Sequence, residues 1–416
     1  MSTFASSTIR PFQPGLATAS LLGSLLIGLG VFLLGFVFQE PAPYELFMAV
    51  QMPLWFVLGL RISRNIAPLL GLMLLFNIGG LLSLTVMIDL DTGPMYVAVS
   101  TFLALSSVFY AAIIEDRQER LQVIFKAWTL AAVGTATLGI LGYFHAFPGA
   151  DMFTRYERAM GAFQDPNVFG PFLIAPSLYL IHGLLTGRLM AAPLRILGLL
   201  IIAFGVFLSF SRAAWALFIF SAVAMVIILL IQKRSGAFRL KILLLTMTAT
   251  VLMVLTLAIA LQSEQVRNIF SARTELVQDY DGGHLGRFER HQIGFLMSME
   301  RPLGIGPLAF NKIFPEDEHN IWLKSLTTYG WLGFVCYLTM MIWTICFGFK
   351  YLLRNRPWQP SLMIAWIVLV GHAAIGNVID LDHWRHMYLL FGILWGCRAL
   401  ERRHQNRNLA QFRPST

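Results

Sequence analysis

Long apolar runs separated by short polar connections dominate the chain. A membrane-spanning helix needs about 20 apolar residues, and twelve runs approach or exceed that length. Their limits are 16–38, 44–60, 66–86, 94–114, 121–143, 168–186, 193–209, 213–231, 240–261, 321–349, 360–379 and 383–397. The pattern predicts an all-α, polytopic integral membrane protein with about twelve transmembrane helices.

Two connections are longer than a helix bundle requires, at 145–167 and 262–320. Long loops in compact proteins are usually functional or disordered. The second loop carries aromatic and aliphatic residues at helical spacing, namely Phe288, Ile293, Phe295, Leu296 and Met299. We therefore expect a large helical loop at 262–320, with short helices folded over the outer mouth of the bundle.

The distribution of charge predicts how the chain sits in the membrane. Only 13% of the residues are charged, against about 25% in soluble proteins. With twelve spans, both termini lie on one side, and the loops of that side hold 20 of the 31 Lys and Arg but 4 of the 22 Asp and Glu. The positive-inside rule makes this side cytoplasmic. The basic residues are scattered between spans, so the net charge of +9 does not predict a nucleic-acid partner.

Arg212 lies in "FLSFSRAAWALF", between two spans on the predicted outer side. An arginine at a helix end can simply extend its charged group to the lipid headgroups. However, arginine is disfavoured on the outer side, and the connection is very short. An arginine at membrane depth is costly and suggests a functional site. A phosphate is a suitable partner, since a guanidinium binds it through two hydrogen bonds.

The large loop adds two further arginines, Arg287 and Arg290, in "GRFERHQ". Three residues apart, they share one face of a helix if one forms there. The two arginines either bind an anion or lie on a solvated helix face, where Glu289 balances their charge. The following "PLGIGP" contains a Gly-x-Gly, but no strand precedes it, so it is not a nucleotide-binding fingerprint. Gly304 and Gly306 are expected to permit a tight turn.

His319 stands immediately before the tenth apolar run. One interpretation is an interfacial histidine that is hydrogen bonded to Glu316 or Glu318. The other is a general base, because an imidazole titrates near neutral pH and nearby carboxylates can orient it. Whether the acidic run Pro315-Glu316-Asp317-Glu318 orients the imidazole is left open by the sequence.

The last outer connection reads "IDLDHWRH" and contains Asp380, Asp382, His383 and His386. Two aspartates and two histidines suggest a metal, but their spacing matches no standard zinc pattern. Polar and aromatic residues of this kind are also common at a membrane interface. We therefore expect no metal site here.

Four motifs resemble those of the O-antigen ligase and O-antigen polymerase superfamily. They are "GAFQDPNVFGPFL" at 161–173, "SFSRAAW" at 209–215, Arg287 about fifteen residues before "PLGIG", and "HNIWLKSLTTYGWLG" at 319–333. They occur in the family's order and on the predicted outer side, and the resemblance covers roughly residues 160–400. The tryptophan that often follows the loop arginine in the family is absent, which leaves both Arg287 and Arg290 as candidates.

The resemblance implies an all-helical, GT-C-like glycosyltransferase of the bacterial inner membrane, with a periplasmic active site. It would have N-terminal transmembrane helices at 1–143 and a ligase-like core at 144–416. The implied reaction is inverting and uses no metal or cofactor. The donor would be a glycan on undecaprenyl pyrophosphate. The acceptor would be lipid A–core for a ligase or another lipid-linked glycan for a polymerase.

The resemblance also implies roles for particular residues. His319 would deprotonate the acceptor hydroxyl, and Arg212 with Arg287 or Arg290 would bind the donor pyrophosphate. Ser211 and Asn320, beside them in the motifs, would also contact substrate. Apart from these substrates, the expected partners are membrane lipids.

A transporter or flippase of lipid-linked sugar is an alternative from another class, because about twelve spans are common among transporters. Such proteins have internal repeats and broken spans at matching positions of the two halves, with binding sites near the midplane. No such pairing is evident, and the polar residues gather at the outer face.

Overall fold

The computed structural model describes residues 14–187, 189–233, 235–274 and 286–411. Residues 275–285 of the large loop lie outside this range, as do Arg10, Arg188, Arg234 and Arg413 from the basic loops. The described chain is helical apart from loops and one antiparallel hairpin, in which Thr154 pairs with Ala159. This confirms the predicted all-α fold class.

The elements follow one another along the chain with mostly short connections. Their bounds are α1 Pro14–Leu33, α2 Pro43–Val57, α3 Ala67–Leu84, α4 Gly93–Asp116, α5 Arg120–Tyr143, η1 Ala150–Phe153, β1 Thr154–Arg155, β2 Arg158–Ala159, α6 Pro166–Phe172, α7 Ile174–Thr186, η2 Leu189–Ala191, α8 Ala192–Leu208, α9 Arg212–Gln232, α10 Gly236–Ala260, α11 Glu264–Thr274, α13 Arg287–Met299, α14 Phe310–Ile313, α15 Ile321–Tyr351, α16 Gln359–Ile375 and α17 Arg385–Gln411.

Each of the twelve predicted apolar runs overlaps a helix, with α6 and α7 together filling the sixth. Among the described residues, seven helices are long and apolar enough to cross a membrane, and three shorter apolar helices accompany them. Helices α2 and α17 fall in neither group. Helix α2 has only 15 residues, and α17 continues into a polar segment, "ERRHQNRNLAQ". The structure is that of a polytopic membrane protein.

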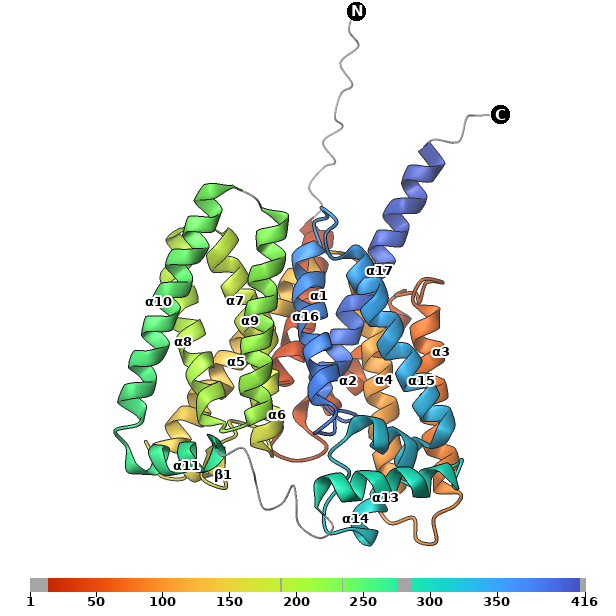
Figure 1. Cartoon of the computed structure of the whole chain (residues 1–416). Coiled ribbons are helices and arrows are strands. Elements are labelled where there is room, and N and C mark those ends of the chain that lie inside the picture. The colour runs from red at the N-terminus through yellow and green to blue at the C-terminus, as the bar shows by residue number, and fades with distance from the viewer. Residues whose placement is uncertain (1–13, 188, 234, 275–285, 412–416) are drawn as a thin grey trace, which may run out of the picture.

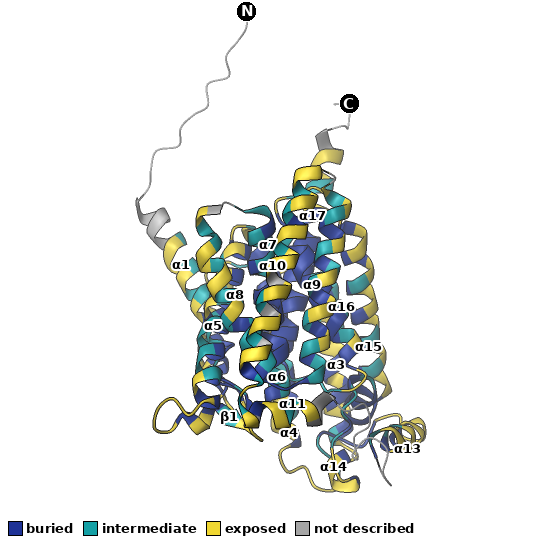
Figure 2. Cartoon of the chain, turned by 60° about the vertical axis from the view of Figure 1, so that its left-hand side comes forward, coloured by how far each residue is buried: buried dark blue, intermediate teal, exposed yellow. Residues whose placement is uncertain are grey.

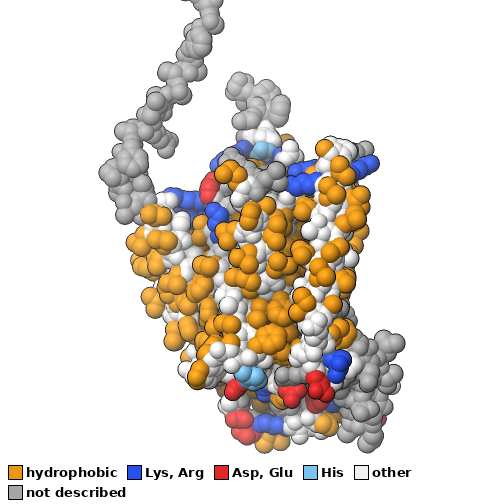
Figure 3. All heavy atoms as spheres, turned by 90° about the vertical axis from the view of Figure 1, so that its left-hand side faces the viewer, with side chains coloured by type: hydrophobic (Ala, Val, Ile, Leu, Met, Phe, Trp, Pro, Cys, Tyr) orange, Lys and Arg blue, Asp and Glu red, His pale blue; other side chains and the backbone are white. Residues whose placement is uncertain are grey.

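The long helices run side by side, and the polar segments gather at one end of the bundle (Figure 1). The beginning of α1 and the end of α17 lie at the opposite end. We call the end with the hairpin, α11, α13 and α14 the loop end. Helices α11, α13 and α14 confirm the prediction of short helices within 262–320. Lys and Arg are concentrated at the terminal end on the face shown in Figure 3, and Asp and Glu mostly at the loop end.

Helix α15 packs closely against α3 through glycines. A Cβ added to Gly79 would overlap the carbonyl oxygen of Tyr329 and lie 2.8 Å from the amide nitrogen of Gly333. The two backbones therefore approach each other directly. The Ser83 hydroxyl also donates to the carbonyl of Thr328 over 2.6 Å. This contact fixes the first turns of α15, which follow His319.

Helix α15 is interrupted at Gly330, which has φ 65° and ψ −173°. The turn that follows α13 packs into this interruption. Ile305 donates its amide to the carbonyl of Thr327 (2.7 Å), and Trp331 donates to that of Pro302 (2.9 Å). Gly304 and Gly306 have φ values of 80° and 101°, which confirms the predicted tight turn. At this interruption, hydrogen bonds thus connect the large loop to the membrane-spanning helix α15.

Gly330→Ala should destabilise the protein by about 1–3 kcal/mol. Alanine is strained at a positive φ, and its Cβ would lie 2.7 Å from the carbonyl oxygen of Pro302. Gly71→Ala in α3 is the matched control, because nothing lies within 4 Å of the added Cβ. The control should be neutral or slightly stabilising. Thermal unfolding in detergent measures both, and equal melting temperatures for the two variants would contradict the strained role of Gly330.

Candidate functional site

A cavity of about 770 Å³ opens at the loop end of the bundle. Its lining includes residues at or just before the first turns of several helices, with Asn167 in α6, Arg212 in α9, Arg287 in α13, His319 just before α15 and Trp384 just before α17. The first amides of a helix have no intrahelical acceptor, and the helix dipole is positive there. Several such ends around one cavity make it suitable for an anion.

The tight connection between α8 and α9 places Arg212 in this cavity. Ser211 is the N-cap of α9, and its hydroxyl accepts a hydrogen bond from the amide of Ala214 over 3.4 Å. Phe210 turns the chain with φ 45°. Arg212 is consequently the first residue of α9, and its side chain lines the cavity together with Ser211.

The two loop arginines, Arg287 and Arg290, occupy different environments although both lie in α13. Arg287 lines the cavity. Arg290 is buried with 3% of its surface exposed, does not line the cavity, and donates to Glu316 over 2.6 Å. The structure therefore brings Arg287, and not Arg290, together with Arg212.

A third arginine, Arg158, lines the same cavity from β2. It is buried, and it donates to the carbonyl of Ser209 (2.7 Å) and to the amide oxygen of Asn167 (2.8 Å). These bonds join three of the loop-end segments around the cavity. Sequence analysis did not identify Arg158, because the loop in which it lies has no hydrophobic periodicity. The one available signal was that Arg158 is close in sequence to the Pro166-Asn167 motif.

His319 lines the cavity with φ 45°. Its Nδ1 lies 3.8 Å from Oδ2 of Asp380. The suggested pairing with Glu316 or Glu318 is wrong, because Glu316 bonds Arg290 and Glu318 accepts from the Thr327 hydroxyl. The nearest carboxylate is instead that of Asp380, which lies 61 residues further along the chain.

Asn320 caps α15. Its side-chain oxygen accepts from the amides of Trp322 (3.0 Å) and Leu323 (3.1 Å). Its own amide nitrogens are used as well, since the backbone one donates to Asp380 and the side-chain one to the carbonyl of Asn377. The side chain does not line the cavity, so the structure gives Asn320 a positioning contact beside His319.

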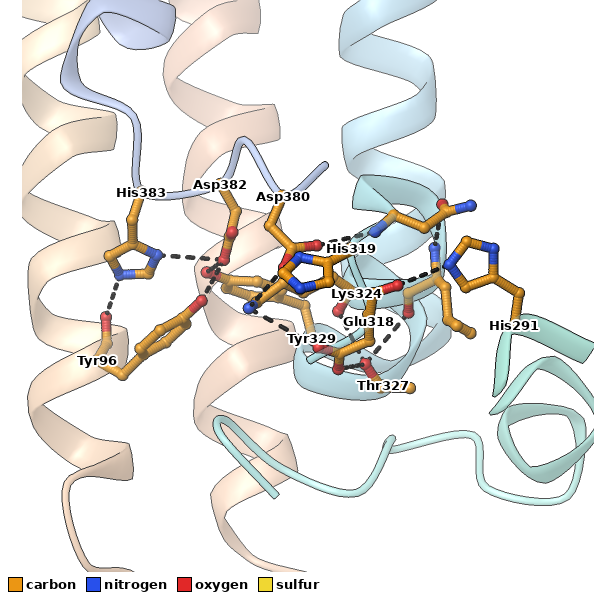
Figure 4. A network of polar contacts seen from close by, with 12 residues as sticks. Tyr96, His291, Glu318, His319, Lys324, Thr327, Tyr329, Asp380, Asp382 and His383 are labelled. Carbon is orange, nitrogen blue, oxygen red and sulfur yellow. Dashed lines mark hydrogen bonds and ion pairs between the residues drawn. The ribbon is translucent and has the colours of Figure 1, made fainter. Parts of the chain in front are cut away.

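Lys324 is the second residue that sequence reasoning missed. It is 5% exposed, and its Nζ lies 3.4 Å from Oδ2 of Asp380 and 3.8 Å from Oε2 of Glu318. A buried ammonium needs such partners. In Figure 4, His319, Lys324 and Asp380 gather where the loop before α15 meets the loop before α17. Lys324 and His319 therefore share one carboxylate.

Asp382 completes the network on the other side of Lys324. Its Oδ2 accepts from the hydroxyls of Tyr96 (2.6 Å) and Tyr329 (3.1 Å) and contacts Nδ1 of His383 at 3.1 Å. Burial alone would raise the pKa of Asp382. The Lys324 ammonium and the contacts with His383 and Tyr96 outweigh burial and hold this pKa below its usual range.

Asp380, Asp382 and His383 of "IDLDHWRH" thus belong to the site, where their side chains are hydrogen bonded to other protein groups. Within the described ranges, no three His, Cys, Asp or Glu side chains are placed so that they could hold a metal ion together. Asp380 and Asp382 both line the cavity with His383.

Glu318 has a consequence for the pH dependence of stability. Burial, with the charge of Asp380, raises the pKa of its carboxyl to about 7, against an ordinary value of 4.5. The folded state then binds more protons than the unfolded state between these two values, so stability falls as pH rises through this window. Glu318→Gln removes this titration.

The melting temperature of the wild type, measured relative to that of Glu318→Gln, should therefore decline from pH 4.5 to 7 and then level off. Thermal unfolding of both proteins in the same detergent across this pH range measures the difference. Parallel curves would contradict the raised pKa of Glu318.

One wall of the cavity is apolar. Its side chains come from the first turns of α9 and from the end of α16 with the segment after it, and they are Ala213, Ala216, Ala374, Ile375, Val378 and Ile379. A cavity lined both by arginines and by apolar side chains can accommodate a molecule that has an anionic head and a hydrocarbon tail.

Residues 197–338 match the family model described as O-antigen ligase. The matched segment includes Arg212, Arg287 and His319 and ends before Asp380. A search of curated proteins finds no match. The family match confirms the predicted resemblance and supports the placement of the chain in the O-antigen ligase and polymerase superfamily.

Proposed function

We propose that the protein is an inverting membrane glycosyltransferase of the O-antigen ligase type. It transfers a glycan from undecaprenyl pyrophosphate to lipid A–core at the periplasmic face of the bacterial inner membrane. The loop end is then periplasmic and both termini are cytoplasmic, in accord with the basic loops at the terminal end. The observation that carries this proposal is the single cavity that unites Arg212, Arg287 and His319.

The donor pyrophosphate binds to Arg212 and Arg287, with Arg158 beside them. A leaving pyrophosphate gains negative charge in the transition state, and fixed positive groups aimed at that charge stabilise it. Three guanidinium groups and several helix beginnings supply this stabilisation without a metal ion or another cofactor. The polyprenyl chain leaves along the apolar wall between α9 and α16.

His319 removes the proton from the acceptor hydroxyl. The oxygen then attacks the anomeric carbon from the face opposite the pyrophosphate, and the bond between this carbon and the phosphate oxygen breaks. The electron pair leaves with undecaprenyl pyrophosphate, and the proton stays on the imidazole. Asp380, close to Nδ1 of His319, orients the ring and stabilises its protonated form.

Reconstituted transfer tests the proposal. Purified protein in lipid, supplied with a lipid-linked glycan and lipid A–core, should form the extended acceptor in the presence of EDTA. A strict requirement for a divalent cation would contradict the metal-independent mechanism. Movement of the intact lipid-linked glycan across the bilayer, without glycosidic bond formation, would show a flippase instead.

A chromosomal deletion distinguishes the ligase from a polymerase of the same superfamily. Polymer that accumulates on the lipid carrier, unattached to lipid A–core, supports the ligase. Single repeat units without polymer would show a polymerase of O-antigen or exopolysaccharide units.

Replacement of Arg287 or Arg290 by methionine should separate the two loop arginines. Arg287→Met should raise the KM for the donor and lower kcat, since it removes a charge from the cavity. Arg290→Met should mainly lower the melting temperature, because it removes the hydrogen bond that ties α13 to Glu316. Kinetics and thermal unfolding of both variants measure this, and the reverse pattern would show that Arg290 is the phosphate ligand.

A further inference from the structure

Helix α13 exposes an unusual stripe of apolar residues. Its inward face carries Arg290, Gly294 and Ser298, which are buried. A Cβ added to Gly294 would lie 2.8 Å from the ring of Phe310. The opposite face carries large apolar side chains that are exposed, namely Phe288, Ile293, Phe295, Leu296 and Met299. At 100° per residue, four of these five share one sector of the helix surface, which also contains the exposed Gln292. Ile293 lies outside this sector, beyond Glu289 and Glu300.

The position of α13 indicates what covers this stripe. The helix lies crosswise to the membrane spans at the loop end (Figure 1). It stands at the margin of the bundle with exposed residues on its outward side (Figure 2). An amphipathic helix in this orientation has the geometry of helices that lie in the membrane interface.

The end of α13 is attached to the surface of α15 that faces lipid. The indole nitrogen of Trp331 donates to the carbonyl of Ser298 over 2.9 Å. Trp331, Leu332 and Val335 are themselves exposed on a helix that spans the membrane. The end of α13 is therefore held beside exposed apolar residues of α15, and a tryptophan stands at the junction, as is common at the interface.

We propose that α13 is an interfacial anchor whose apolar stripe is immersed in the outer leaflet of the membrane. The partner is the lipid surface itself. Phe288 and Arg287 occupy the first turn of α13 and line the cavity, so the anchor fixes their height relative to the lipid headgroups. If the proposed function holds, this is also the height of the donor pyrophosphate. The lipid contact itself does not depend on that function.

Cysteine labelling in proteoliposomes tests the anchor. Phe295→Cys and Leu296→Cys replace exposed side chains of the stripe, with 49% and 58% of their surface exposed. Lys312→Cys is the reference for water, and Val335→Cys is the reference for lipid. A membrane-impermeant maleimide is added, and the labelling of the wild type, with Cys336, Cys346 and Cys397 in apolar segments, is subtracted. Labelling after denaturation verifies that each thiol is reactive.

We expect positions 295 and 296 to react at least about tenfold more slowly than position 312 and as slowly as position 335, because a maleimide in water does not reach a thiol among acyl chains. This protection should persist when the lipid-to-protein ratio is raised. Reaction as fast as at position 312 would overturn the proposal. Protection that disappears on dilution into more lipid would also overturn it, since the stripe would then contact a second copy of the chain.

Discussion

His319→Asn should lower kcat for glycan transfer by about 10²–10⁴-fold, the usual contribution of a positioned general base. Asparagine cannot accept the acceptor's proton, whereas it adopts a positive φ more readily than most residues. The replacement therefore preserves the turn at φ 45° and removes only the imidazole. The melting temperature should change little, and the KM for the donor should stay close to that of the wild type.

The matched control is His145→Asn. His145 also has a positive φ, of 50°, and a carboxylate partner, Asp151, but it does not line the cavity. Transfer by this variant should equal that of the wild type. Wild-type kcat in His319→Asn would exclude His319 as the base.

Arg212→Ala should lower kcat/KM by about 10²–10³-fold, the cost of removing one preorganised group that stabilises developing negative charge. Arg212→Lys should recover part of this loss, because an ammonium retains the charge but lacks the two-point geometry of the guanidinium. The loss should appear in kcat as well as in KM, since the charge on the leaving pyrophosphate grows in the transition state.

Arg155→Ala is the control for the loss of a loop-end arginine. Arg155 donates to the carbonyl of Gln164 over 2.9 Å and does not line the cavity. Its replacement should leave kcat/KM unchanged. Equal losses in Arg155→Ala and Arg212→Ala would indicate a general electrostatic effect of the outer surface rather than a phosphate site.

Most of the fold could be predicted from the sequence, because the hydrophobic pattern of a membrane chain is strong. All twelve apolar runs contain helices. The interruption of α15 at Gly330 was not predicted, because the sequence shows one apolar run across residues 321–349. The interruption depends on the turn at 302–306, which binds there from a distant part of the chain.

The candidate site was predictable where local motifs mark it, at Ser211, Arg212, Arg287 and His319. Asp380 was not recognised as the neighbour of His319, because the two lie 61 positions apart in the sequence. Lys324 was missed since a lysine within an apolar run has no local signal for its buried carboxylate partners. The different environments of Arg287 and Arg290 likewise could not be predicted, because they depend on how α13 packs against Glu316.

The chemical form of the released lipid distinguishes displacement of pyrophosphate from other routes of glycan transfer. Transfer by the wild-type protein can be followed with a donor labelled in the lipid and analysed by mass spectrometry, while NMR gives the anomeric configuration of the new linkage. We expect that undecaprenyl pyrophosphate with both phosphates is released and that the configuration is inverted relative to the donor. Release of undecaprenyl monophosphate, or retention of configuration, would contradict it.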